Sequence, residues 1–202
     1  TIRANTTPQL AGNFFSFKLG KAREAFEAVP WVRHAVVRRV WPDRIAVRLE
    51  EHHAAALWDA EDGNERLVNS YGEVFEANVG DVEDEGLPLL AGPEGTSARM
   101  LAMMQRLVPL LQRIDRDLLE LHLSGRGSWR AELDGETTIE LGRGTDDEVL
   151  ARSERFVRTL DRVTARFPGA PRALVTADLR HPDGYALRLA GISTAPNTKP
   201  KQ

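Results

Sequence analysis

The sequence predicts an α+β protein, and three observations support this fold class. Apolar residues recur at helical spacing in three segments, 17–29, 96–114 and 145–167. Between and around them lie short alternating or Val-rich runs that are typical of strands, separated by Gly, Asn, Asp and Pro. The chain has 202 residues, of which 42% are hydrophobic and 28% charged, so it can bury the core of one ordinary domain or of two small ones.

The first predicted helix is followed directly by a predicted hairpin. Its helical spacing extends from residue 17 to residue 29, and Pro30 ends it. The Val-rich run 31–41 and the alternating run 44–50 indicate two strands, joined by a turn with the sequence Trp41-Pro42-Asp43-Arg44. Beyond residues 51–54 the strands become shorter and the turns more polar, so we place a domain boundary there.

The rest of the chain predicts a sheet with two helices. Short strands are expected at 54–58, 66–68, 73–75 and 87–91, with the acidic stretch 81–85 as an exposed loop. The helix over 96–114 is followed by strands at 118–123, 129–133 and 137–141. A capping-box pattern, Thr145 with Glu148 three residues later, opens the last helix. A hairpin over 173–180 and 185–189 precedes a polar tail, 192–202, that is predicted to be disordered.

Composition excludes several classes of function. The chain has no cysteine, which excludes disulfides and thiolate chemistry, and its net charge of −3 argues against nucleic acid as a partner. No run of about 18 apolar residues occurs. Because the chain starts at Thr1 without a signal-peptide pattern, we expect it to be part of a longer protein whose membrane anchor lies upstream.

No catalytic, cofactor or metal site is predicted. Glu50 and His52 share one face of a strand end, with His53 on the other, but two ligands do not make a metal site. The segment 141–144 lies between a strand and a helix, yet it lacks the glycine spacing and the Lys-Ser/Thr of a phosphate-binding loop. The alternative to a binding protein is an enzyme that uses Glu50, His52 or His53 as its acid–base group.

A more specific signal comes from residues 30–51. A helix that ends in Pro-Trp-Val, a strand, a Trp-Pro-Asp turn and a strand that closes in Leu-Glu-Glu resemble the end of the POTRA domain of FtsQ-type bacterial division proteins. Further motifs of that family follow in its order: Ala56-Leu57-Trp58, Asn69 to Phe75, Leu87 to Gly95, Ser128-Trp129, Leu141 to Gly144 and Ala177 to Arg180. The resemblance covers residues 14–190.

The resemblance implies a partial POTRA domain over residues 1–52, lacking its N-terminal strand, and a β domain over residues 53–191. The second domain is expected to hold a mixed or antiparallel sheet and two packed helices. The implied protein is a scaffold without enzymatic activity or cofactor, held in the inner membrane by a single helix, with this region in the periplasm at the division septum. Its implied partners are FtsB and FtsL, which it joins to early division proteins, and other division proteins at the POTRA domain.

The same resemblance places the FtsB-binding surface at the C-terminal strand, 185–189. An edge strand there would offer N–H and C=O groups with which a partner segment can pair. The expected partner-binding residues are Arg180, His181, Asp183, Gly184, Tyr185, Leu187, Leu189 and Arg126. Three positions depart from well-known relatives: His181 replaces a Tyr, Leu189 replaces a Trp, and Gly127 replaces the second Arg of an Arg-Arg-Ser-Trp motif.

POTRA domains also bind substrate chains in outer-membrane assembly and secretion. The alternative function that the POTRA-like segment suggests is therefore a substrate-binding module of outer-membrane assembly or secretion.

Overall fold

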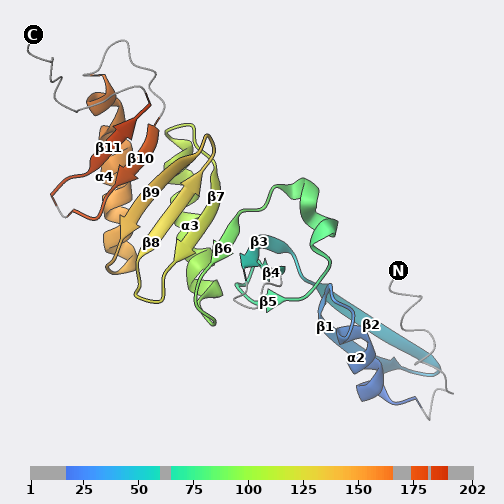
Figure 1. Cartoon of the computed structure of the whole chain (residues 1–202). Helices are drawn as coiled ribbons and strands as arrows, with labels where there is room; N and C mark the ends of the chain where they lie inside the picture. Colours follow the sequence, from blue (N-terminus) through green and yellow to red (C-terminus); the bar gives the residue numbers. More distant parts are fainter. Residues whose placement is uncertain (1–16, 60–64, 166–173, 182, 191–202) are drawn as a thin grey trace, which may run out of the picture.

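The computed structural model describes residues 17–59, 65–165, 174–181 and 183–190, and these form two sheets in an elongated arrangement (Figure 1). The expected loss of the first POTRA strand within residues 1–13 and the expected disorder of residues 192–202 both lie outside the described residues. None of the described helices combines the length and hydropathy needed to span a bilayer.

The smaller sheet is the predicted hairpin, covered on one face by a helix. Helix α2 (Leu19–Glu27) ends three residues before Pro30 and packs on the antiparallel strands β1 (Val32–Val40) and β2 (Arg44–Glu51). Phe26, Val32 and Ala35 form its small core. The Val-rich run 31–41 and the alternating run 44–50 therefore predicted both strands to within one residue.

The larger sheet has nine strands in the order β11-β10-β9-β8-β7-β6-β3-β4-β5. Its first strands are β3 (Ala54–Asp59), β4 (Glu65–Asn69), β5 (Val74–Phe75) and β6 (Leu89–Ala91). The others are β7 (Leu118–Leu123), β8 (Trp129–Leu133), β9 (Thr137–Gly142), β10 (Leu174–Asp178) and β11 (Ala186–Leu189). The pairs β3–β6, β6–β7 and β9–β10 are parallel and the rest antiparallel, which confirms the predicted mixed sheet and the α+β class.

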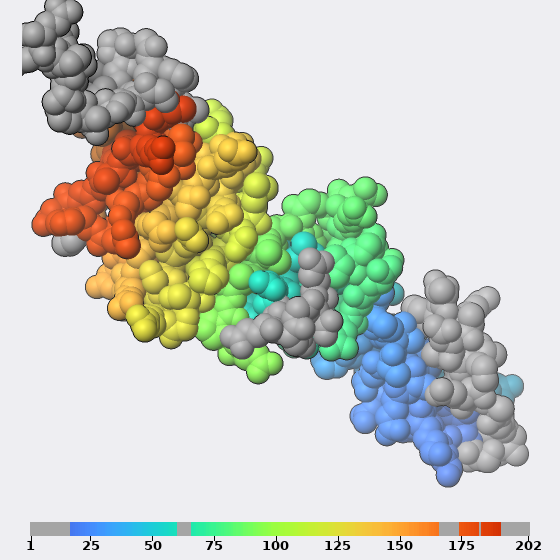
Figure 2. Space-filling model, in the orientation of Figure 1, coloured from blue at the N-terminus to red at the C-terminus, as the bar shows by residue number. Residues whose placement is uncertain are grey.

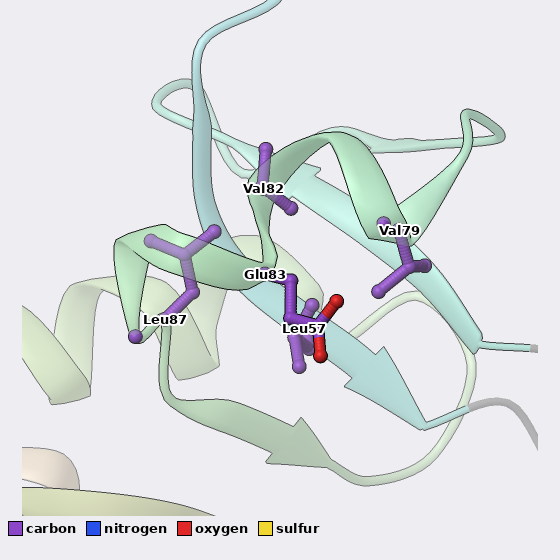
Figure 3. Close-up of a pocket in the computed structure, with 7 residues that line it drawn as sticks. Leu57, Val79, Val82, Glu83 and Leu87 are labelled. Atoms are coloured by element: carbon purple, nitrogen blue, oxygen red, sulfur yellow. The ribbon is translucent and has the colours of Figure 1, made fainter.

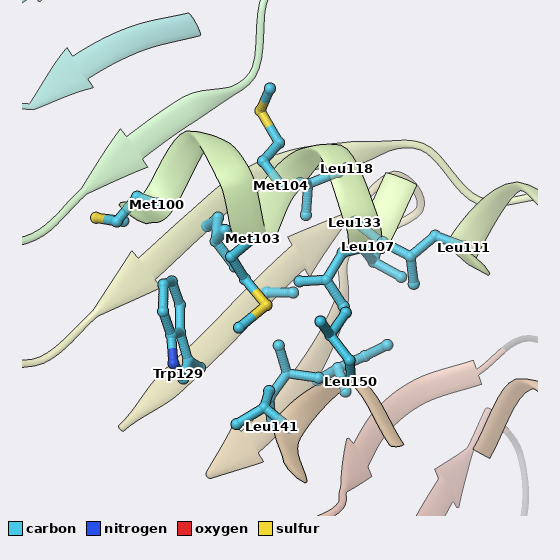
Figure 4. Close-up of a cluster of buried hydrophobic side chains, with 14 of the residues drawn as sticks. Met100, Met103, Met104, Leu107, Leu111, Leu118, Trp129, Leu133, Leu141 and Leu150 are labelled. Carbon is cyan, nitrogen blue, oxygen red and sulfur yellow. The ribbon is translucent and has the colours of Figure 1, made fainter. Parts of the chain in front are cut away.

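Two helices, α3 (Ser97–Gln112) and α4 (Asp146–Thr164), pack against the sheet and bury the main core (Figure 4). Trp129 on β8 is fully buried in this core, together with Leu107 of α3 and Phe156 of α4. The predicted capping box is confirmed: the Thr145 side chain accepts a hydrogen bond from the Glu148 N–H, and the Glu148 carboxylate accepts one from the Thr145 N–H.

The acidic stretch predicted as an exposed loop is instead a 3-10 helix, η2 (Val79–Glu85). The Asn78 side chain accepts a hydrogen bond from the Gly80 N–H at its start, and Gly86 ends it with a left-handed backbone, φ 60°. Val82 is buried while the acidic residues around it are exposed. Val82 is the one apolar residue in the acidic stretch 81–85, and a single apolar position has no periodicity from which a helix can be predicted.

An ionic network joins the two sheets. Arg33 of β1 donates hydrogen bonds to both carboxylate oxygens of Glu73, at 2.7 and 2.8 Å, and to Glu50 of β2 at 2.5 Å. Its guanidinium also lies 3.9 Å from the centre of the Tyr71 ring. Hydrogen bonds from Arg33 and from Asn69 lower the pKa of Glu73 to about 2.

Aromatic contacts reinforce the same junction. The His52 ring stacks on Phe75 with 4.1 Å between ring centres, and its Nδ1 lies 2.9 Å from the side-chain nitrogen of Asn69. Trp31 meets Phe75 edge-on and donates a hydrogen bond from its indole N–H to Asp81 of η2. The hairpin is thus tied to the nine-stranded sheet through both β4–β5 and η2.

Candidate partner-binding site

The predicted C-terminal strand is β11, and it is an edge strand of the described sheet. It pairs only with β10, antiparallel, from Asp178 opposite Ala186 to Leu174 opposite Leu189. Figure 2 shows β10 and β11, in red and orange, at the end of the described surface away from the blue hairpin. The outer backbone edge of β11 has no strand beside it among the described residues.

Side chains hold β11 against the core from one face only. Leu189 is buried, and Tyr185 and Leu187 are half-buried against the main core, whereas Ala186 and Arg188 are exposed. Tyr185, Leu187 and Leu189 therefore lie on one face of the strand, and Ala186 and Arg188 on the other. Tyr185, Leu187 and Leu189 were predicted to bind the partner. In the structure their side chains pack on the core and stabilise β11.

Tyr185 makes the most specific of these contacts. Its ring meets Phe156 of α4 edge-on, with 5.2 Å between ring centres, and its hydroxyl lies 2.6 Å from the Thr159 hydroxyl. Thr159 donates its own hydroxyl proton to the Arg155 carbonyl at 2.8 Å, so Tyr185 is the donor in the shared hydrogen bond. The start of β11 is therefore fixed to α4.

A hollow of about 590 Å³ lies beside the start of β11. Its lining contains four of the predicted residues, Arg180, His181, Gly184 and Tyr185, together with Asp178 and Ala186. The last two were not predicted as site residues, although Asp178 lies two positions before Arg180 in a motif of the family. Residues two apart in a strand lie on the same face, so the position of Asp178 two residues before Arg180 could have predicted it as a site residue.

Arg180 already has an acidic partner within the chain. Its guanidinium binds Asp178 through two hydrogen bonds of 2.9 and 2.5 Å, and its backbone N–H donates to the same carboxylate at 3.0 Å. These hydrogen bonds lower the pKa of Asp178. Because most of the Arg180 side chain remains exposed, at 62%, a second carboxylate can approach it from solvent.

Two other predicted residues lie near this hollow but do not line it. Asp183 is exposed within the β10–β11 connection, and Arg126 is exposed on the turn between β7 and β8. That turn leads into Trp129, which pairs with Gly142 at the end of β9, and a Cβ on Gly142 would lie 2.9 Å from Cγ of Arg180. Arg126 thus belongs to the same end of the sheet.

The residues of the enzymatic alternative have structural partners instead. Glu50 pairs with Arg33, and His52 packs on Phe75, where burial lowers its pKa. The His53 carbonyl accepts a hydrogen bond from the Ser70 N–H. All three therefore contribute to the junction between the sheets.

Comparison with known proteins gives matches over most of the chain. The family described as "POTRA domain, FtsQ-type" matches residues 1–52, and the family described as "Cell division protein FtsQ/DivIB, C-terminal" matches residues 56–180. Proteins named "Cell division protein FtsQ" from Thiomonas arsenitoxydans and Bordetella pertussis are each 38% identical over 95% of this chain, which covers 70% and 72% of their lengths. The relative of that name from Burkholderia pseudomallei is 41% identical over 95% of this chain, which covers 74% of its length.

Proposed function

Because the chain belongs to the FtsQ/DivIB family of cell division proteins, we propose that it is a binding scaffold of the division machinery whose β11 edge pairs with a segment of FtsB. The observation that supports this most directly is the position of β11. It ends the described sheet, with one backbone edge bonded to β10 and the other open. A partner strand can add to such an edge through main-chain hydrogen bonds.

The side chains around the edge suit a partner with an acidic residue. Arg180 and His181 line the hollow next to β11, and Arg126 and Arg188 are exposed nearby. An incoming carboxylate at Arg180 would compete with Asp178 or share its guanidinium. Tyr185, Leu187 and Leu189 hold the strand in place so that its edge is already formed before binding, which lowers the entropic cost of association.

The proposal extends to the context of the protein. FtsL would join through its complex with FtsB, and other division proteins would bind the hairpin unit. Residues 1–52 would form the POTRA domain and residues 53–191 the β domain, in the periplasm at the septum, with an inner-membrane anchor upstream. The scaffold would act without a catalytic step.

Binding of an extracytoplasmic FtsB segment from the same organism tests the proposal. Arg180→Glu places a second carboxylate beside Asp178 and should weaken binding at least about tenfold, or about 1.4 kcal/mol. Arg48→Glu, exposed on β2 of the smaller sheet, makes the same charge change away from the β11 edge and should bind like the wild type.

Amide hydrogen exchange of residues 186–189 supplies the second readout. The amides among them that point to the open edge should exchange more slowly when the FtsB segment is bound, because a new strand would pair with them. Equal binding by the two charge variants, or tight binding without added protection in β11, would contradict the edge-strand proposal.

A further inference from the structure

A second hollow lies near the other end of the sheet, between β3 and η2. It measures about 420 Å³ and is lined by Leu57, Val79, Gly80, Val82, Glu83, Gly86 and Leu87, and we call it the β3–η2 pocket. Figure 3 shows Leu57 on β3 with Val79 and Glu83 of η2 beside it. Its volume falls within the range of ligand-binding pockets.

Local backbone structure explains why the pocket is open. Leu57 faces η2, because its neighbours on the strand belong to the main core on the opposite face. Val79 and Leu87 border the same space, and each of the three aliphatic side chains is only half-buried. Gly80, the second residue of the helix, and Gly86, directly after its end, contribute no side chain to fill the pocket. An apolar surface therefore faces solvent beneath η2.

The segment that supplies most of the pocket lining is strongly acidic. Residues 67–98 contain no Lys, Arg or His and seven acidic residues: Glu73, Glu76, Asp81, Glu83, Asp84, Glu85 and Glu94. Glu73 pairs with Arg33, Glu76 with Arg66, and Asp81 with Trp31. Glu83, Asp84 and Glu85 are exposed and have no ion pair with any residue that the structure describes. Three free carboxylates thus follow one another along the helix that covers the pocket.

We infer that the β3–η2 pocket is a second docking site, which takes an apolar side chain from a partner segment that carries Lys or Arg next to it. The aliphatic lining selects the apolar side chain, and the row of carboxylates selects the adjacent cation. The same carboxylates repel anionic lipid and nucleic acid, which leaves a basic polypeptide as the occupant. This inference is independent of the proposed FtsB edge, since the two sites share no residue.

The test uses the whole chain and a synthetic peptide in which Leu and Arg alternate. Two control peptides carry Ser in place of Leu, or Glu in place of Arg. Methyl NMR signals of Leu57, Val79 and Leu87 report occupancy of the pocket. The Leu–Arg peptide should shift these signals saturably, with weaker binding at higher salt, whereas both control peptides should leave them unchanged.

Matched variants separate a specific site from general attraction. Glu83→Lys and Glu94→Lys make the same charge change in the same acidic region, but only Glu83 lines the pocket. Glu83→Lys should weaken binding by at least about fivefold more than Glu94→Lys. Val79→Phe, checked for folding by circular dichroism, should fill the space and abolish the shift at Leu57. Arg180→Glu should leave this binding unchanged.

Several results would overturn the inference. Equal effects of the two Lys variants would indicate attraction to the whole acidic region, and binding of the Ser peptide as tight as that of the Leu peptide would remove the apolar pocket. Unchanged binding by folded Val79→Phe would do the same. If the chain were a dimer that Val79→Phe made monomeric, the pocket would be an interface between two copies instead.

Discussion

The hydrogen bond between Tyr185 and Thr159 should couple β11 to α4 by a measurable free energy. Tyr185→Phe keeps the ring against Phe156 but removes the hydroxyl, and Thr159→Val removes the acceptor with little change in shape. Tyr185→Phe should cost about 1 kcal/mol of unfolding free energy, the net value of one half-buried hydrogen bond. Thr159→Val should cost more, because it also removes the hydrogen bond to the Arg155 carbonyl. The double variant should cost no more than Thr159→Val alone, because Tyr185→Phe breaks only a bond that Thr159→Val already removes.

Urea unfolding followed by circular dichroism measures these costs. For a slope of about 2 kcal/mol per molar urea, Tyr185→Phe should lower the midpoint by about 0.5 M. Amide exchange adds a local readout: the β11 amides that bond to β10 should exchange about fivefold faster in Tyr185→Phe, since 1 kcal/mol changes an opening equilibrium by that factor. Additive costs in the double variant, or unchanged exchange in β11, would refute the reasoning.

Three further predictions follow from the junction, the capping box and the sheet end. Hydrogen bonding to Arg33 lowers the pKa of Glu73 from 4.5 to about 2. The ionised Glu73 therefore contributes to stability above pH 4.5, and this contribution is lost as pH falls toward 2. The difference in unfolding free energy between the wild type and Glu73→Gln should shrink over that range. Thr145→Ala should lower the unfolding free energy by about 1 kcal/mol in urea titrations, and Thr145→Ser should restore most of it. Gly142→Ala, at φ 81° and with its new Cβ 2.9 Å from Cγ of Arg180, should cost more than about 1 kcal/mol, and wild-type thermal stability would contradict the close approach.

Local sequence signals predicted where the helices and strands lie, but not which strands pair with one another. The capping box at Thr145 and the alternation over 44–50 each depend on residues close in the chain, and both appear in the structure at the expected places. The order of the strands does not follow from such signals. The parallel pairing of β6 with β3 and β7 joins segments that are separated by η2 and by α3, and only burial of the shared core decides it.

In the candidate site, too, residues that are close in the sequence were predicted and contacts between distant segments were not. Arg180, His181, Gly184 and Tyr185 were predicted and line one hollow, since they are neighbours along one hairpin. The engagement of Tyr185 with Thr159, 26 positions earlier, was not predictable because nothing in the local sequence sets that contact. The β3–η2 pocket was missed for a related reason: its lining comes from two segments whose facing arrangement exists only after folding.

The order of strands in the large sheet also sets the valency of the protein. β11 and β3 are six strand positions apart, which at about 4.8 Å per step separates the two proposed sites by roughly 29 Å. A single partner chain that occupied both would need a linker of about nine extended residues, and a shorter one could engage only one site at a time. With a linker of matching length, the second contact becomes intramolecular, so two weak contacts at opposite parts of one rigid sheet would together give a long-lived complex.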